Sequence, residues 1–439
     1  MTPDPETSLA GPETPAPIGG RLSRASIFER LGPGLITGAA DDDPSGIATY
    51  SQAGAQFGVN ILWTVVLTYP LMTAIQSLSA RIGRVTGRGL AANMARVFPK
   101  PVLACLVALL FIANTINIGA DLAAMGAAAR LVTGWNEHIL TVSFALVSLG
   151  LQIFVPYHLY VRFLKWLTLA LFAYVGVVFA VKIDWGETLA RTLFPHLAIT
   201  AASVTTIVAV FGTTISPYLF FWQASEEVED EEADPEASPL LEKPEQGPAQ
   251  LGRIGWDTYL GMAFSNLIAF FIILTTAVTL FAAGKTDIQT SAQAAEALRP
   301  IAGELAFVLF TLGIVGTGLL ALPVLAGSAA YALSEAVGWK SGLEKRWSDA
   351  RGFYAVITLA TLIGLGIDYT PVDPIKALFW SAVLNGVIAV PIMAAMMVVA
   401  TRRKEMGDFT ATTGQRWMGW IATAVMAAAA SAMIILQSV

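Results

Sequence analysis

Residues 39–50 read Ala-Ala-Asp-Asp-Asp-Pro-Ser-Gly-Ile-Ala-Thr-Tyr, which places three carboxylates, a proline and a glycine inside a long apolar run. A carboxylate at bilayer depth costs about 2.5 to 3.5 kcal/mol on insertion scales, so it persists where it faces a partner or a watery cavity. Pro44 removes a backbone donor and disfavours helical angles at Asp43, while Gly46 tolerates angles that other residues resist. We therefore predict a helix broken at mid-membrane, where freed carbonyls and carboxylates form a cation site.

The composition indicates a polytopic membrane protein. Of 439 residues, 55% are hydrophobic and 13% are charged, whereas soluble domains carry about 25% charged residues. The net charge of −6 is concentrated in residues 226–252, which hold ten acidic residues and one lysine. The rest of the chain is therefore basic, as expected beside anionic lipid.

Motifs of other functional classes are absent from the sequence. It contains no phosphate-binding loop of the Gly-x-x-x-x-Gly-Lys-Ser/Thr type, and its three histidines are far apart. None of the nucleophile–base spacings that an integral-membrane enzyme needs is present. We expect no catalytic activity, no cofactor and no nucleic-acid partner, with a metal ion and the lipid bilayer as partners. The oligomeric state stays open, with a monomer as the working expectation.

Eleven apolar runs are long enough to span a bilayer, which takes about 20 residues each. They fall at residues 31–56, 59–80, 101–131, 138–156, 161–182, 200–223, 254–283, 303–335, 351–368, 374–400 and 416–437. With the amino terminus inside, 20 of the 26 Lys and Arg residues fall in inner loops and tails, as the positive-inside rule requires. We predict a multi-pass protein of the cytoplasmic (inner) membrane with a cytoplasmic amino terminus and an outer carboxyl terminus.

The spans divide into two halves. We predict a disordered cytoplasmic tail at 1–28, a first five-helix repeat at 29–183, an outer connecting segment at 184–199, a second five-helix repeat at 200–401 and an eleventh transmembrane helix within 402–439. An odd number of spans per half inverts the second half relative to the first. The fold class is thus all-α, with eleven transmembrane helices in a 5+5 inverted repeat.

The second half contains its own interruption, Gly-Thr-Thr-Ile-Ser-Pro at residues 212–217, at the position that corresponds to the first break. Helices 1 and 6 are therefore both expected to be broken. Matching breaks in two inverted repeats indicate a transporter with a midplane site. The alternative, two unrelated proline kinks, leaves the three aspartates unexplained.

Residues 226–252 form a predicted cytoplasmic loop. Its acidic run either gathers cations at the inner mouth or is a solvated helix end that frays into a linker. Glu226 follows Pro217 closely enough to face an exit path.

Both broken segments resemble the NRAMP family of divalent-metal transporters. Residues 32–34 (Gly-Pro-Gly), 43–46 (Asp-Pro-Ser-Gly) and 54–58 (Gly-Ala-Gln-Phe-Gly) are similar to that family's Asp-Pro-Gly-Asn helix and the segment after it. Ser45 stands where the family has glycine, and Gly46 where it has asparagine. The resemblance implies a LeuT-like fold and alternating-access transport.

The departures from the family pattern have a chemical direction. Ser216, Pro217 and Tyr218 stand where the family has Met-Pro-His, and Gln223 replaces a second histidine. On the third span, Asp121 matches the family's aspartate and Ala124 replaces its glutamate.

Without a thioether the site loses its bias toward soft ions. The pattern thus resembles the NRAMP-related magnesium transporters and implies Mg²⁺ import, with Mn²⁺ also accepted. Losing both histidines and the glutamate removes groups that carry protons near neutral pH, so the resemblance implies uptake without proton coupling. Proton-coupled Mn²⁺/Fe²⁺ import is the alternative. A sodium-coupled amino-acid symporter would share the architecture, but three aspartates would repel its substrate carboxylate.

The candidate metal ligands are Asp43, Asp42, Ser45, Thr213, Thr214, Ser216, Gln223, Asp121, Asn385 and Glu226. Asp43 is interpreted as a metal ligand, and the alternative is that it forms a structural salt bridge. One of Asp41 and Asp42 is expected to line a vestibule while the other caps or pairs. Asn114, Asn117 and Asp121 form one polar stripe, and Ser381 and Asn385 form a second; each serves the ion pathway or joins neighbouring helices by hydrogen bonds.

Overall fold

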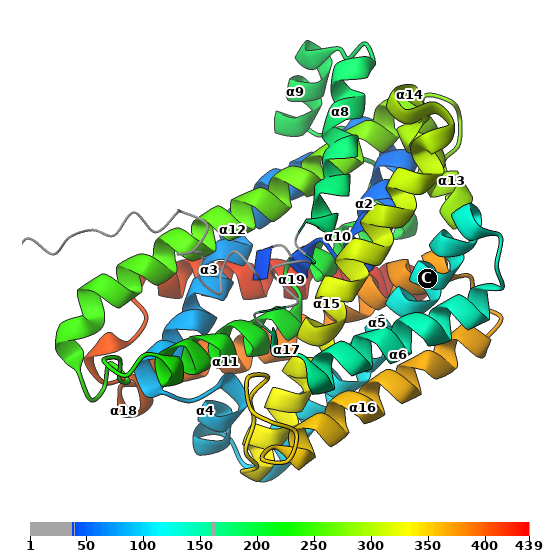
Figure 1. Cartoon of the computed structure of the whole chain (residues 1–439). Coiled ribbons are helices and arrows are strands. Elements are labelled where there is room, and N and C mark those ends of the chain that lie inside the picture. The colour runs from blue at the N-terminus through cyan, green and yellow to red at the C-terminus, as the bar shows by residue number, and fades with distance from the viewer. Residues whose placement is uncertain (1–36, 39, 158, 160–163, 165, 439) are drawn as a thin grey trace, which may run out of the picture. The chain divides into compact units, whose positions relative to one another are not determined.

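The computed structural model describes residues 37–38, 40–157, 159, 164 and 166–438, and the statements below concern those residues. The predicted tail at 1–28 lies outside them. The long helices are α2 (Pro44–Phe57), α3 (Trp63–Thr86), α5 (Lys100–Thr133), α6 (Glu137–Phe154), α10 (Ala201–Thr214), α11 (Pro217–Ala233), α12 (Gly247–Thr276), α15 (Ala306–Val337), α16 (Arg351–Leu365), α17 (Pro374–Thr401) and α19 (Thr413–Ser438) (Figure 1). Shorter helices are α4 (Leu90–Val97), α8 (Phe172–Ala180), α9 (Trp185–Leu193), α13 (Ser291–Ala295), α14 (Arg299–Ala302) and α18 (Arg403–Met406).

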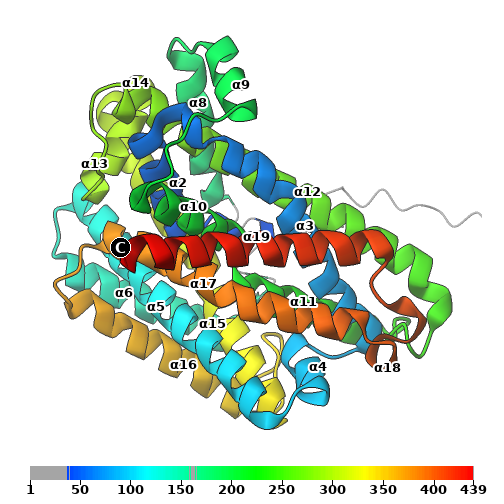
Figure 2. The same ribbon diagram turned by 180° about the vertical axis from the view of Figure 1, so that it is seen from behind.

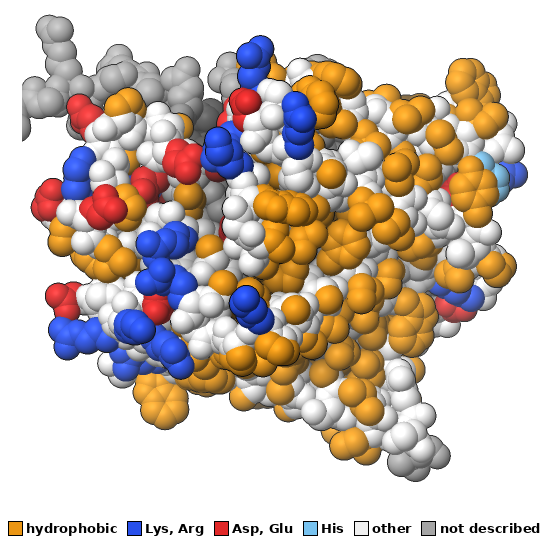
Figure 3. All heavy atoms as spheres, turned by 90° about the horizontal axis from the view of Figure 1, so that it is seen from below, with side chains coloured by type: hydrophobic (Ala, Val, Ile, Leu, Met, Phe, Trp, Pro, Cys, Tyr) orange, Lys and Arg blue, Asp and Glu red, His pale blue; other side chains and the backbone are white. Residues whose placement is uncertain are grey.

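The described part of the chain is all-helical, which confirms the predicted class. Eight of its helices, with α10 and α11 counted as one, are long and apolar enough to cross a membrane, and two sharply bent pairs raise the number to ten. The bent pairs join Pro44–Ile61 to α3 at 108° and Leu169–Ala180 to α9 at 118°. Apolar side chains cover the middle of the face in Figure 3, with charged side chains gathered toward its edges. Eleven spans in two inverted halves of five stay a prediction.

The first predicted break is present at Asp42 and Asp43. Residues 40 and 41 are helical, the helix stops, and α2 begins at Pro44. Asp43 is the N-cap of α2, where its Oδ1 accepts a hydrogen bond of 2.7 Å from the Gly46 backbone N–H. Proline at the first helical position and aspartate at the cap are favoured there because the first-turn N–H groups lack intrahelical partners.

The second predicted break separates α10 from α11. The first of these helices ends at Thr214 and the second begins at Pro217, so Ile215 and Ser216 lie outside both. Ser216 precedes a proline and is extended, with φ −76° and ψ 131°, as the steric effect of the proline ring on the preceding residue requires.

The helices pack closely around the two breaks. α2 contacts α10, α12 and α17, and α5 contacts α15 and α17; α19 lies along α17 (Figure 2). Gly212 is in α10 at its crossing with α17, where an added Cβ would lie 2.0 Å from the Ala382 carbonyl oxygen and 2.4 Å from the Gly386 nitrogen. Glycine therefore allows the two backbones to meet at the second break.

The predicted loop at 226–252 is shorter in the structure. α11 continues to Ala233 and α12 begins at Gly247, so the acidic run is helical. The acidic run is also partly buried, because basic side chains from other helices compensate the charge of its carboxylates. Arg84 of α3 lies 3.4 Å from Glu231, and Arg253 of α12 pairs with Glu227. These contacts disagree with a fully solvated helix end.

Candidate metal centre

The two breaks lie side by side in the interior. A Cβ built on Gly46 would lie 3.4 Å from Thr213 Oγ1, and the Tyr50 hydroxyl is 3.0 Å from Thr214 Oγ1. Each of these pairs joins α2 to α10. The two broken segments, on whose proximity the predicted midplane site depends, are therefore in contact.

The Asp43 carboxylate is held by three donors from different elements. Besides the Gly46 N–H on Oδ1, Asn117 of α5 donates to Oδ2 at 3.1 Å and the Tyr218 hydroxyl of α11 donates to Oδ2 at 3.2 Å. Asp43 is 1% exposed. Hydrogen bonds to a charged acceptor stabilise the charge in the absence of water, so Asp43 is fixed in position at the point where three helices meet.

The orientation of the Asn117 amide is set by α17. Ser381 donates to Asn117 Oδ1 at 2.6 Å, which leaves the amide nitrogen directed toward Asp43. Part of the predicted polar stripe on α5 therefore belongs to the site. Asn114 has another role, because its amide donates to the Leu325 carbonyl and the Ser328 hydroxyl of α15 at 2.8 Å each. It joins α5 to α15 by hydrogen bonds, which is the second of the two roles considered for the stripe.

Asp121 lies one helical turn beyond Asn117 on the same helix. It is 0% exposed, and neither of its carboxylate oxygens has a hydrogen-bond partner among the described residues. The backbone N–H of Ser45 is near Asp121 but lacks the geometry of a hydrogen bond, and the charge of Asp121 interacts with that of Asp43. Two buried carboxylates are thus close enough for their charges to interact, and Asp121 has unused capacity to accept a cation.

The second break adds oxygen atoms to the site. The Ser216 hydroxyl donates to the Gly212 and Thr213 carbonyls at 2.8 and 2.7 Å, and Thr214 Oγ1 donates to the Val210 carbonyl at 2.7 Å. The carbonyls of Gly212 and Thr213 therefore each accept a hydrogen bond from the Ser216 hydroxyl. A carbonyl has two lone pairs and a hydroxyl oxygen can accept while it donates, so these groups retain capacity for an ion.

Three other predicted ligands are buried on helices that contribute to this centre. Ser45 is buried and donates to the Leu378 carbonyl of α17 at 3.2 Å. Gln223 of α11 accepts a 2.5 Å bond from Thr37, and its amide nitrogen has no partner in the described part of the chain. Asn385, on the helix that carries Ser381, is 1% exposed, and its Oδ1 is likewise unpartnered within that part.

The last two candidates have other neighbours than the three donors that contact Asp43. Asp42, together with Asp41, faces Ser265 of α12, whereas the described donors to Asp43 come from α2, α5 and α11. Glu226 lies nine residues after Pro217, which is about 14 Å along the helix. Its charged neighbours are Glu227, Glu229, Asp230 and Glu344, so Glu226 belongs to the acidic run and not to the central site.

Two residues that contact the aspartates of the first break have little or no signal in the sequence. Tyr218 is marked only by its place in the second broken motif, yet its hydroxyl contacts Asp43 directly. Ser265 is a single serine in an apolar run and carries no sequence signal. Within the described ranges, no group of three or more His, Cys, Asp or Glu side chains could hold a metal ion, so an ion here needs hydroxyl, amide or carbonyl ligands as well.

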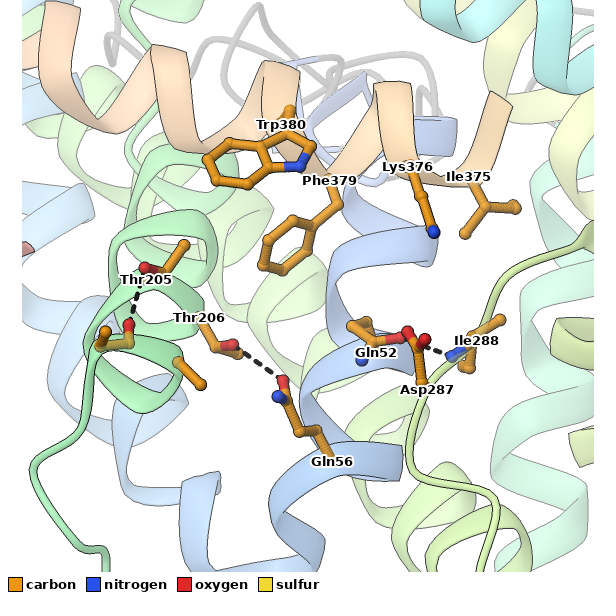
Figure 4. Close-up of a pocket in the computed structure, with 12 residues that line it drawn as sticks. Gln52, Gln56, Thr205, Thr206, Asp287, Ile288, Ile375, Lys376, Phe379 and Trp380 are labelled. Carbon is orange, nitrogen blue, oxygen red and sulfur yellow. Dashed lines mark hydrogen bonds between the residues drawn. The ribbon is translucent and has the colours of Figure 1, made fainter. Parts of the chain in front are cut away.

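A cavity of about 400 Å³ opens beside the carboxyl-terminal half of α2 (Figure 4). It is lined by Gln52 and Gln56 of α2, by the first turns of α10 and α17, and by residues 287–288. Gln56 accepts a bond of 3.1 Å from Thr206, and Gln52 Oε1 accepts one of 2.9 Å from the Ile288 N–H. The cavity ends short of the site, since Asp43 and Asp121 are buried.

Proteins of similar sequence are metal transporters. The divalent metal cation transporter MntH of Klebsiella pneumoniae is 25% identical over 92% of this chain and 94% of its own length, and that of Verminephrobacter eiseniae is 26% identical over 89% and 85%. Solved structures share the fold. A variant of the manganese transporter of Eremococcus coleocola has a TM-score of 0.73 at 14% identity over 94% of this chain and 87% of that one. The inward-facing structure of Mhp1 has a TM-score of 0.53 at 16% identity, and the match covers 93% of this chain and 91% of that one.

The family comparison covers nearly all of the described residues. The Natural resistance-associated macrophage protein-like family (Nramp) matches residues 34–436, a range that includes both breaks and Asp121. The predicted family is confirmed, and its named relatives are transporters and not enzymes. The chain belongs to the Nramp family.

Proposed function

We propose that the chain imports divalent cations across the cytoplasmic membrane, with Mg²⁺ as the main substrate and Mn²⁺ also accepted, by alternating access and without proton coupling. The observation that carries this proposal is the Asp121 carboxylate, buried next to Asp43 with no hydrogen-bond donor on either oxygen from the described residues. A buried carboxylate without a partner is strongly destabilising, and a cation between Asp43 and Asp121 would compensate both charges.

The donor set favours a hard ion. The side chains that contact Asp43 are an amide and a phenol, and the second break presents hydroxyl and carbonyl oxygens. Mg²⁺ is bound through a few oxygens and keeps several of its waters. No sulfur ligand occupies position 216, so the preference that a thioether gives to Mn²⁺ and Fe²⁺ is missing. The solved manganese transporter of similar fold supports Mn²⁺ as a second substrate.

The side chains at residues 218 and 223 favour uptake without proton coupling. Tyr218 and Gln223 stand where the family carries histidines, and neither side chain ordinarily exchanges a proton near neutral pH. A divalent ion needs no coupled proton to move inward, because the membrane potential contributes about 2.3 kcal/mol per charge per 100 mV. The alternative is proton-coupled Mn²⁺/Fe²⁺ import, which predicts that ion flux acidifies the receiving compartment.

The cavity beside α2 is proposed as the outer access path. With the amino terminus inside, the carboxyl-terminal half of α2 points outward, and Gln52 lies about 14 Å along the helix from Asp43. Rocking of the broken helices about the site would then expose Asp43 to one side at a time. No resident cofactor is involved, and the transported ion is the substrate.

Uptake by purified protein in liposomes tests the proposal. Asp43→Asn is expected to abolish Mg²⁺ influx, measured with an enclosed Mg²⁺-sensitive dye under an inside-negative potential, while the protein stays folded. Asp368→Asn is the matched control. This carboxylate lies away from the breaks, and its Oδ2 is 2.7 Å from His138 Nδ1. Wild-type influx through Asp43→Asn would refute the assignment.

A further inference from the structure

The buried pair Asp41 and Asp42 is the strongest feature that the central site leaves unexplained. Both aspartates face Ser265 of α12: its hydroxyl lies 2.6 Å from Asp41 Oδ2 and 3.3 Å from Asp42 Oδ1. We propose that Asp41, Asp42 and Ser265 form a second divalent-cation site, separate from the one at Asp43. This inference rests on the proposed function, because it takes the same class of ion.

The pair lacks compensation for its charge. Asp41 is 0% exposed and Asp42 is 1% exposed. One hydroxyl proton serves two carboxylates, and Asp41 Oδ1 and Asp42 Oδ2 have no hydrogen-bond partner among the residues that the structure describes. The charged groups that interact with the pair are the two aspartates themselves and Asp43, and within the same residues neither forms an ion pair with a lysine or arginine. Burying charges without a partner is costly.

A helix that ends at the pair is expected to offer backbone carbonyl oxygens as further ligands. The helical residues before the break end at Asp41, and the last carbonyls of a helix lack N–H partners from a following turn. The same end of a helix carries partial negative charge. Carboxylate, hydroxyl and carbonyl oxygens are the ligands that Mg²⁺ and Mn²⁺ take.

The position of Ser265 is fixed by a backbone contact one turn away. A Cβ on Gly38 would lie 2.3 Å from the Gly261 carbonyl oxygen, so the two backbones touch. Gly38 precedes Asp42 by four residues, and Gly261 precedes Ser265 by four, which places the carboxylates and the hydroxyl at the next turn of the same interface. The site is thus built by close packing and does not depend on a mobile side chain.

The charge of the pair indicates the class of ion that it would hold. Two carboxylates carry two negative charges, which one divalent cation neutralises. The donors of Asp43 are Gly46, Asn117 and Tyr218, whereas the donor of the pair is Ser265. The pair thus contacts α12, from which Asp43 accepts no hydrogen bond in the described part of the chain, and the second ion would lie on that side of the break.

The number of Mn²⁺ ions bound per chain tests the proposal. It is measured by titrating the full chain in detergent and following the loss of the electron paramagnetic resonance signal of free Mn²⁺. Wild type is expected to bind two ions per chain. Asp43→Asn and the double variant Asp41→Asn with Asp42→Asn should each bind one. A single ion in wild type that Asp43→Asn removes would overturn the second site and leave the central site intact.

Ser265→Ala provides a milder variant in case the double variant does not fold. It removes a group that contacts both carboxylates, so the second ion should bind about tenfold more weakly or worse, with the first unchanged. Thr423→Ala is the matched control, because its hydroxyl bonds within its own helix to the Gly419 carbonyl at 2.8 Å. Equal affinity for both ions in Ser265→Ala and wild type would contradict the proposal. If Asp43→Asn instead keeps both ions and full uptake, the proposed function fails.

Discussion

Replacing Asp121 with asparagine separates the charge of this residue from its shape. The amide fills nearly the same volume, but the uncompensated negative charge is removed from the buried site. If the transported ion neutralises that charge, the variant loses one partner of a buried charge pair. Such a loss costs about 3 to 5 kcal/mol, and each 1.4 kcal/mol is about tenfold in an equilibrium constant. Asp121→Asn should therefore weaken Mg²⁺ binding by about two to three and a half orders of magnitude.

The same variant has a measurable effect on thermal stability. An ion at about 100 times its Kd stabilises the folded state by about 2.7 kcal/mol. With about 2.1 cal/mol/K of unfolding entropy per residue, a chain of 439 residues gains about 3 °C in Tm. Wild type should show this Mg²⁺-dependent shift in detergent, and Asp121→Asn should not at the same concentration. Without Mg²⁺ the variant should be at least as stable as wild type.

Asp368→Asn controls for the loss of a carboxylate at a site away from the breaks, where the partner is His138 and not an ion. Its Mg²⁺-dependent shift should equal that of wild type. Wild-type Mg²⁺ affinity in Asp121→Asn would refute the role of Asp121, because an unpartnered buried charge that does not contribute to ion binding would need another explanation.

Three further outcomes are expected. Ser216→Met adds a soft ligand at the second break, so the ratio of Mn²⁺ to Mg²⁺ uptake in liposomes should rise; an unchanged ratio would count against selection by ligand softness. Gly212→Ala forces a Cβ to 2.0 Å from the Ala382 carbonyl oxygen, so it should destabilise the protein by about 1 to 3 kcal/mol in thermal unfolding. The control is Gly150→Ala, whose Cβ would have no atom within 4 Å and which should be neutral or stabilising. Equal effects of the two substitutions would show that α10 and α17 do not meet at Gly212. Mg²⁺ influx should leave the internal pH of the liposomes constant, and acidification in step with influx would favour the proton-coupled alternative.

Both helix breaks could be predicted from the sequence because their causes are local. A proline after Asp43 and another after Ser216 restrict the preceding residue wherever the chain lies, and both breaks are present. The long spans are predictable from apolar runs for the same reason. The short helices α4 and α9 were missed, since eight or nine residues give little periodic signal.

The partners of the site residues could not be predicted, because they come from distant parts of the chain. Asn117 lies 74 residues from Asp43 and Tyr218 lies 175 residues away. The ion pairs of the acidic run after Glu226 could not be predicted for the same reason, since Arg84 and Arg253 reach it from α3 and α12. Asp41 and Asp42 share a partner on α12 that no local pattern identifies.

The position of a bound ion tests the central claim most directly. Crystals grown with Mn²⁺ can be measured at a wavelength where manganese scatters anomalously. We predict anomalous density between the carboxylates of Asp43 and Asp121, next to the backbone of residues 213–216. An ion-loaded structure with no density beside Asp43, at a Mn²⁺ concentration that supports transport, would contradict that claim.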